Sequence, residues 1–76
     1  MKIEVFGPGC ARCVSLYENV LKAVGQAGAA CQVEKVTDMQ RILATGAIST
    51  PVLVIDGEVK SAGRVLTPEQ IKPLLG

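Results

Sequence analysis

Two cysteines separated by two residues, Cys10 and Cys13, are the side chains of this chain best suited to chemistry. They follow a strand-like segment at 2–6 and a Gly7-Pro8-Gly9 turn, and they open a stretch with helical periodicity. Thiols at this spacing can form a disulfide and reopen. The unpaired N–H groups and the positive dipole at a helix N-terminus favour the thiolate, which is the reactive form. The pattern therefore predicts thiol–disulfide exchange, with Cys10 as the nucleophile.

The second cysteine, Cys13, lies one turn further along the predicted helix, where we expect it to be more buried. We therefore predict that it is the resolving thiol, which attacks the mixed disulfide formed by Cys10 and releases the reduced substrate. Arg12 lies between the two cysteines and adds a positive charge that favours the thiolate.

The cysteine pair also has alternative uses. As a structural bridge it would close a loop of four residues, for which the chain-entropy treatment gives only about 2 kcal/mol. As a soft-metal site, its two thiolates would bind Cu(I), Zn(II) or arsenite. A closed zinc site needs four ligands, whereas the chain has one further cysteine, Cys31, and no histidine. The leading hypothesis therefore includes no metal; soft-metal binding is the alternative function, and a non-catalytic adaptor is the third.

Length and charge limit the classes of function. A chain of 76 residues makes one domain, over 1–76, and its formal charge of +1 gives no footprint for nucleic acid or an acidic membrane surface. No apolar run approaches the ~18 residues needed to span a bilayer, and Lys2 and Glu4 interrupt any signal-peptide pattern. We expect a cytoplasmic protein, monomeric and without a bound cofactor. In that compartment a C-x-x-C pair is typically catalytic or metal-binding.

Apolar periodicity predicts the elements that position the cysteines. It indicates a strand at 1–6, and then a helix that ends at two glycines, Gly25 and Gly28. A second strand is predicted at 31–36, with Cys31 as a small core side chain at its start.

Turn and cap signals predict the next elements. A capping-box spacing at 37–40 begins a second helix, which stops at Gly46. The continuous apolar run 52–55 is typical of a strand buried on both faces, and Asp56-Gly57 joins it as a hairpin to a fourth strand at 58–62. The side chains that we expect the second helix to bury are Met39, Ile42 and Leu43.

A third helix is predicted at the C-terminal end of the chain. Thr67 to Gln70 form a second capping box, with Pro68 at the first helical position, and Pro73 predicts a kink or a tight last turn. The order β-α-β-α-β-β-α makes the first two strands parallel and the hairpin antiparallel. We therefore predict an α/β fold with a four-stranded mixed sheet and helices on both faces. The side chains buried by the third helix are expected to be Ile71, Leu74 and Leu75.

Three features together resemble the thioredoxin family over nearly the whole chain. They are this element order, the C-x-x-C pair after the first strand, and Thr50-Pro51 at the start of the third strand. The chain looks most like the minimal thioredoxin/glutaredoxin-like proteins of bacteria and archaea, often called small redox-active disulfide proteins. The resemblance implies a thioredoxin fold and a protein-disulfide oxidoreductase or electron carrier of cell redox homeostasis. The redox-active disulfide would be Cys10-Cys13.

The resemblance also implies how substrates bind and what the partners are. In the family the proline is cis and lies beside the disulfide, so Pro51 would be cis and the Thr50 backbone would be free to pair with an extended substrate segment. Gly63 lies where the family often has a glycine near the active-site surface, which would let a substrate backbone approach. The implied partners are protein disulfides and an unidentified reductase or thiol donor.

The chain departs from both family patterns around the cysteines. The thioredoxin sequence Trp-Cys-Gly-Pro-Cys is replaced by Gly9-Cys10-Ala11-Arg12-Cys13, and the glutaredoxin sequence Cys-Pro-Tyr-Cys is absent. The glutathione-site sequence Gly-Gly-x-Asp is replaced by Ala62-Gly63-Arg64-Val65, so glutathione is not implied as a specific substrate. Thioredoxins carry a buried acid that accepts a proton from the resolving cysteine; Glu4 lies in the first strand, and we assign this role to no residue.

Overall fold

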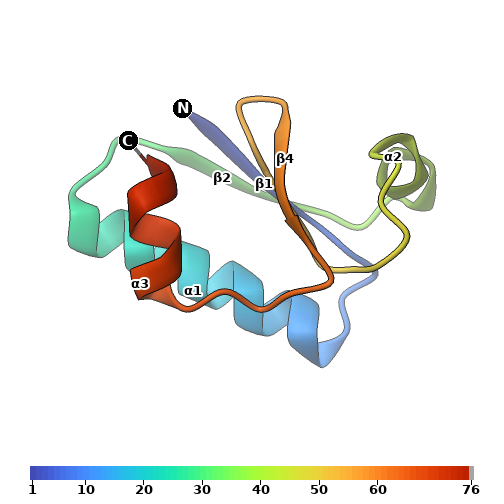
Figure 1. The fold of residues 1–76 in the computed structure, drawn as a ribbon, viewed down its shortest axis with the longest axis horizontal. Coiled ribbons are helices and arrows are strands. Elements are labelled where there is room, and N and C mark those ends of the chain that lie inside the picture. The colour runs from blue at the N-terminus through green and yellow to red at the C-terminus, as the bar shows by residue number, and fades with distance from the viewer. Residues whose placement is uncertain (76) are drawn as a thin grey trace.

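The structure is a computed structural model that describes residues 1–75, and in this range it contains four strands, three α-helices and a short terminal 3₁₀ helix (Figure 1). The predicted element order is confirmed. In chain order the elements are β1 (Lys2–Phe6), α1 (Ala11–Ala27), β2 (Gln32–Val36), α2 (Met39–Ala44), β3 (Val52–Ile55), β4 (Glu58–Ala62), α3 (Pro68–Ile71) and the 3₁₀ helix η1 (Lys72–Leu75).

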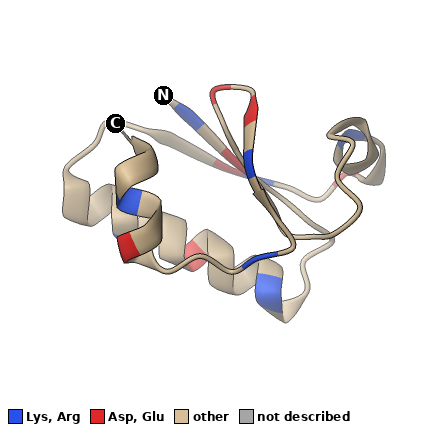
Figure 2. Cartoon of the chain, in the orientation of Figure 1, with Lys and Arg blue, Asp and Glu red and all other residues tan. Residues whose placement is uncertain are grey.

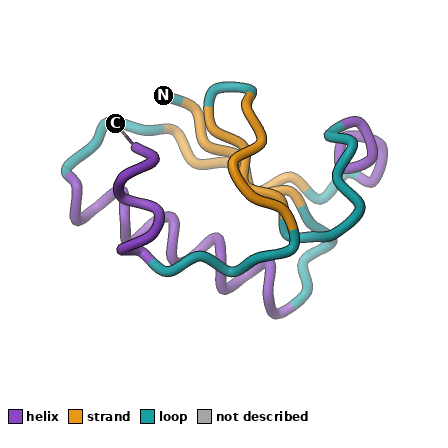
Figure 3. Tube along the Cα trace, viewed as in Figure 1, coloured by secondary structure: helices purple, strands orange, loops and turns teal. Residues whose placement is uncertain are grey.

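The strands form one mixed sheet in the order β2-β1-β3-β4 (Figure 3). β1 and β2 are parallel because α1 crosses between them, and β3 runs antiparallel to both β1 and β4. The β3–β4 hairpin turns at Asp56 and Gly57, whose φ angles of 49° and 82° are those of the two-residue turn that Asp-Gly favours. The predicted mixed sheet and hairpin are therefore confirmed.

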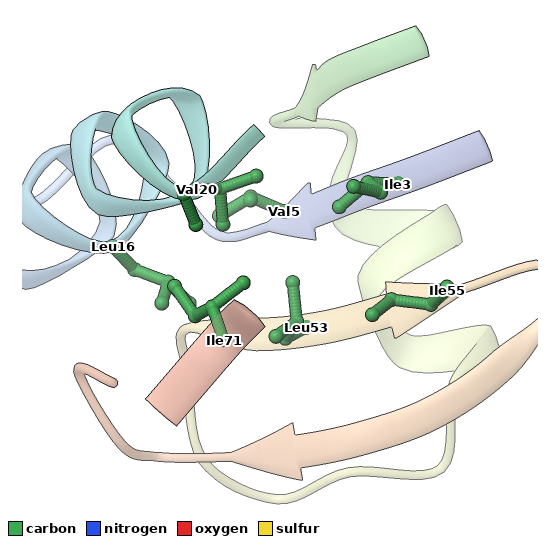
Figure 4. Packing of buried hydrophobic residues seen from close by; sticks show 8 residues of the cluster. Ile3, Val5, Leu16, Val20, Leu53, Ile55 and Ile71 are labelled. Atoms are coloured by element: carbon green, nitrogen blue, oxygen red, sulfur yellow. The ribbon is translucent and has the colours of Figure 1, made fainter. Parts of the chain in front are cut away.

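The two faces of the sheet carry separate apolar clusters. Alternation along β1 directs Ile3 and Val5 toward the face covered by α1 and α3, where Figure 4 shows Val5 beside Val20 of α1, and it directs Phe6 toward α2. The α1–α3 cluster contains Ile3, Val5, Leu16, Val20, Ala23, Leu53, Ile55 and Ile71. The α2 cluster contains Phe6, Val36, Ile42, Val52 and Val54. Helices thus cover both faces, and all four β3 side chains are buried as predicted.

Helix α2 stops at Gly46 as predicted, but it differs from its prediction at its N-terminus and in its buried face. The N-cap is Asp38 rather than Thr37, because the Asp38 carboxylate accepts a hydrogen bond of 2.9 Å from the backbone N–H of Gln40. With only six residues, the helix directs one side chain, Ile42, into the sheet. Met39 and Leu43, predicted to share its buried face, are 57% and 70% exposed.

The boundaries of α1 and β2 also differ slightly from the prediction. Gly25 lies inside α1, which ends only at Gly28, where the backbone is left-handed and its N–H bonds to the carbonyls of the last turn. Strand β2 begins at Gln32, one residue after Cys31.

The last helix follows its sequence signals closely. Thr67 and Gln70 form both hydrogen bonds of the capping box, at 3.2 and 3.0 Å. The chain then tightens into η1, which contains Pro73, as expected for a residue that has no N–H to donate. Among the described residues, none of the helices has both the length and the hydropathy of a bilayer-spanning segment.

Candidate active site

The sheet register brings three distant segments to one end of the molecule. Phe6, the last residue of β1, pairs with Val52, the first residue of β3, and Val52 pairs in turn with Ala62, the last residue of β4. Three segments therefore meet at this end: the one that follows β1, the one that precedes β3 and the one that follows β4. These segments carry the Cys10 loop, Thr50-Pro51 and Gly63.

The two cysteines differ in exposure although they lie close together. Cys10 is the N-cap of α1, with φ −68° and ψ 169°, and its thiol is exposed. Cys13 lies inside the first turn and is 2% exposed. Both thiols are free, and their sulfurs are 3.0 Å apart, beyond the ~2.05 Å of a disulfide bond. The pair therefore consists of one accessible and one protected thiol.

The surroundings shift the two thiol pKa values in opposite directions. The pKa of Cys10 is lowered, chiefly because its sulfur accepts a hydrogen bond from the Cys13 thiol and further because the backbone N–H groups of Cys13 and Arg12 point toward it. Burial raises the pKa of Cys13, and its hydrogen bond to the Cys10 sulfur raises it further. The first turn of α1 contains no acidic residue that would neutralise the positive helix end.

Arg12 acts on the site differently from the prediction. Its backbone N–H helps to lower the Cys10 pKa, after the larger contributions of the Cys13 thiol and the Cys13 N–H. The guanidinium instead donates a hydrogen bond from Nη2 to the carbonyl of Gly63. Arg12 therefore connects the active-site helix to the chain that leaves β4.

The opposite pKa shifts predict that alkylation separates the two thiols. At pH 7 in the reduced protein, we expect iodoacetamide to modify Cys10 at least about tenfold faster than Cys13, because only thiolate reacts. Lowering of the Cys10 pKa also means that its alkylation rate rises at a lower pH than that of an ordinary thiol. Mass spectrometry of the peptide containing both cysteines measures both rates. Equal rates for the two cysteines would contradict the assigned asymmetry.

Thr50 and Pro51 lie at the edge of the site. The peptide bond between them is cis, Pro51 is buried, and its carbonyl accepts a 2.8 Å hydrogen bond from the N–H of Gly63. Within residues 1–75, neither the N–H nor the carbonyl of Thr50 bonds to another backbone group. Thr50 thus offers an unpaired donor and acceptor next to the cysteines.

Gly63 fits its position because it has no side chain. Its φ is 74°, and a Cβ there would lie 2.8 Å from Cβ of Ser49, which leaves no space for a larger residue. Both of its backbone polar groups are used, since its N–H bonds to Pro51 and its carbonyl to Arg12.

Gly7 is a residue of the site that the sequence analysis missed. It is buried, its N–H donates to the carbonyl of Val36 at 2.9 Å, and a Cβ on it would lie 2.3 Å from Sγ and 3.2 Å from Cβ of Cys13. The same Cβ would lie 3.8 Å from that of Thr50. The sequence analysis treated Gly7 only as part of a turn. The available signal was its place directly after a buried strand and before the cysteine pair.

Two other residues considered from the sequence lie away from this end. Cys31 precedes Gln32, which pairs with Lys2 at the start of β1, so Cys31 is at the opposite end of the sheet, half-buried against the α1–α3 cluster. Glu4 shares the α2 face with Phe6, and its 12% exposed side chain pairs with Arg41 at 2.8 Å. The structure does not bring Cys31 and Glu4 together with the cysteine pair.

Comparisons with known proteins agree with this geometry. A family model described as "Thioredoxin domain" matches residues 1–76. The chain belongs to the thioredoxin family. It is 43% identical over 75 residues to a protein named Thioredoxin from Methanothermobacter thermautotrophicus, covering 99% of this chain and 97% of the relative. It is 39% identical over 70 residues to a protein named Thioredoxin from Methanocaldococcus jannaschii, covering 92% and 80%.

Membership of the thioredoxin family decides between the chemical uses of the cysteine pair. This thioredoxin-family chain is a thiol–disulfide oxidoreductase with a thioredoxin fold. Within residues 1–75, no three His, Cys, Asp or Glu side chains gather where they could hold a metal ion. No observation favours the soft-metal alternative.

Proposed function

We propose that the chain reduces protein disulfides, with Cys10 as the attacking thiol and Cys13 as the resolving thiol. The observation that carries this assignment is the asymmetry of the pair. Cys10 is exposed and has a lowered pKa, whereas Cys13 is buried and has a raised pKa, with only 3.0 Å between the sulfurs. An attacking thiol needs access and thiolate character, and a resolving thiol needs proximity and protection.

The reaction proceeds in two exchanges. The Cys10 thiolate attacks one sulfur of the substrate disulfide and forms a mixed disulfide, and the other substrate sulfur leaves as a thiolate that takes a proton from water. Cys13 then gives up its proton to solvent water and attacks Sγ of Cys10, which forms the Cys10-Cys13 disulfide and releases the second substrate sulfur as a thiolate. Two electrons pass from the protein to the substrate, and a reductase or thiol donor returns them to the pair.

Substrate binding is assigned to the edge formed by Thr50, Pro51 and Gly63. The unpaired N–H and carbonyl of Thr50 would bond to the backbone of an extended substrate segment, as an added strand does. Pro51 would flank the sulfurs, and Gly63 would leave room because it has no side chain while its own polar groups are already bonded. In this proposal residues 1–76 work as one domain and as a monomer.

Trapping with a resolving-cysteine variant tests the proposed roles. In Cys13→Ser, the first exchange is expected to proceed and the second to stop, so that a mixed disulfide at Cys10 accumulates with a folded disulfide protein such as insulin. Mass spectrometry after digestion identifies the linked cysteine. The double variant Cys13→Ser/Cys31→Ser is the control, since it excludes capture by Cys31. A mixed disulfide at Cys31, or none in either variant, would show that the roles are assigned wrongly.

A further inference from the structure

Arg12 places a fixed positive charge at the substrate edge. Its side chain is exposed, yet its guanidinium is held by the carbonyl of Gly63, whose N–H is bonded to the carbonyl of Pro51. This chain of contacts runs from the first turn of α1 to the segment that contains Thr50. The charge therefore lies where the backbone of a bound segment would pass.

A second arginine, Arg64, follows Gly63 directly and is also exposed. Figure 2 shows two basic segments side by side here, one in the first turn of α1 and one in the connection from β4 to α3. Within residues 1–75, neither Arg12 nor Arg64 forms an ion pair. Two exposed arginines therefore lie in neighbouring segments, and no carboxylate among residues 1–75 forms an ion pair with either.

The anchored guanidinium is well prepared to bind a carboxylate. Arginine carries five N–H donors in a planar fork, and the Gly63 carbonyl takes a hydrogen bond from Nη2 only. The remaining donors stay available, and the anchor restricts a side chain that would otherwise lose more conformational freedom on binding. Charge-assisted bonds to carboxylate are also stronger than neutral hydrogen bonds.

We propose that Arg12, held by Gly63, and its neighbour Arg64 make the chain selective for disulfides in acidic segments, in which Asp or Glu flanks the attacked cysteine. The proposal rests on the proposed function and names the substrate class of that same site. The chemistry is the two-electron exchange described above, in which the pre-reduced pair supplies both electrons and becomes the Cys10-Cys13 disulfide. The arginines take no part in the bond changes.

A single-turnover assay tests the selectivity. Pre-reduced protein in excess is mixed anaerobically with one of two disulfide-linked peptides, identical except that Glu or Gln flanks the attacked cysteine. Each rate constant is divided by the rate constant of dithiothreitol with the same peptide, which removes differences in peptide reactivity. We expect an acidic-to-neutral ratio of about three to ten at low ionic strength, falling toward one at about 1 M salt.

Matched charge variants assign the effect to these two residues. Arg12→Gln and Arg64→Gln should each lower the ratio at least about twofold, and the double variant should bring it to about one. Lys22→Gln removes the same charge from an exposed position further along α1 and should keep the wild-type ratio. The proposal would be overturned if the wild-type acidic-to-neutral ratio were one at low salt. It would also be overturned if the double variant kept the wild-type ratio. If the neutral peptide is not reduced either, the proposed function itself fails, and the selectivity fails with it.

Discussion

Replacing Cys10 by serine should abolish disulfide reduction, lowering the rate with a protein disulfide at least about a thousandfold. The loss is expected because a serine hydroxyl stays protonated at neutral pH, whereas the Cys10 thiol has a lowered pKa beside Cys13 and the first-turn N–H groups. Cys13 cannot substitute for it, since it is 2% exposed and burial raises its pKa.

Turnover of insulin with dithiothreitol as the final reductant measures this loss. The matched control is Cys31→Ser, which makes the same atomic change at the opposite end of the sheet and should retain wild-type activity. Full activity in Cys10→Ser would refute the assignment of the nucleophile. Loss of activity in Cys31→Ser as well would indicate a role for the third cysteine that its position does not suggest.

Gly7→Ala is the second substitution for which we expect a large effect. The new Cβ would lie 2.3 Å from Sγ and 3.2 Å from Cβ of Cys13, and Cys13 is too buried to move freely. We expect the reduced protein to lose about 1–3 kcal/mol of stability, the usual cost of overpacking. The resolving step should also slow, because Sγ of Cys13 must turn away from its position 3.0 Å from Cys10. Urea unfolding and the decay rate of a preformed mixed disulfide at Cys10 measure the two effects.

The control for Gly7→Ala is the same substitution at a site with free space. A Cβ at Gly25, within α1, would meet nothing within 4 Å, and its φ is not left-handed. Gly25→Ala should therefore raise stability by about 0.5–1 kcal/mol through the loss of helix-interior glycine, and it should leave the resolving step unchanged. If Gly7→Ala changed neither the stability nor the resolving step, residue 7 and Cys13 could separate more easily than their packing indicates.

Local signals in the sequence were sufficient for most of the fold. The apolar run at 52–55, the Asp56-Gly57 turn and the Thr67–Gln70 capping box each determine structure through neighbours in the chain, and each was predicted correctly. The spacing of Cys10 and Cys13 likewise indicated a dithiol at a helix N-terminus, because the helix itself sets their separation.

Features that depend on distant parts of the chain could not be predicted in this way. Adjacent Thr37 and Asp38 can both cap α2, and the sequence pattern alone does not choose Asp38, which caps the helix in the structure. Gly7 has no left-handed φ, so its need for glycine arises only from the approach of Cys13. The bond between Arg12 and Gly63 joins residues 51 positions apart, and no local pattern encodes it.

The strand order has a consequence for how the molecule opens. β1 and β3 are the interior strands of the sheet, and they lead into the Cys10 loop and out of Thr50-Pro51. Fraying of an edge strand leaves this central pair intact, and we expect the cysteine loop and Thr50 to stay together when an edge strand opens. Gly63, in contrast, follows the edge strand β4, and its bonds can open locally. We therefore expect local opening at β4 to release the carbonyl that anchors Arg12 while the cysteine pair stays beside Thr50.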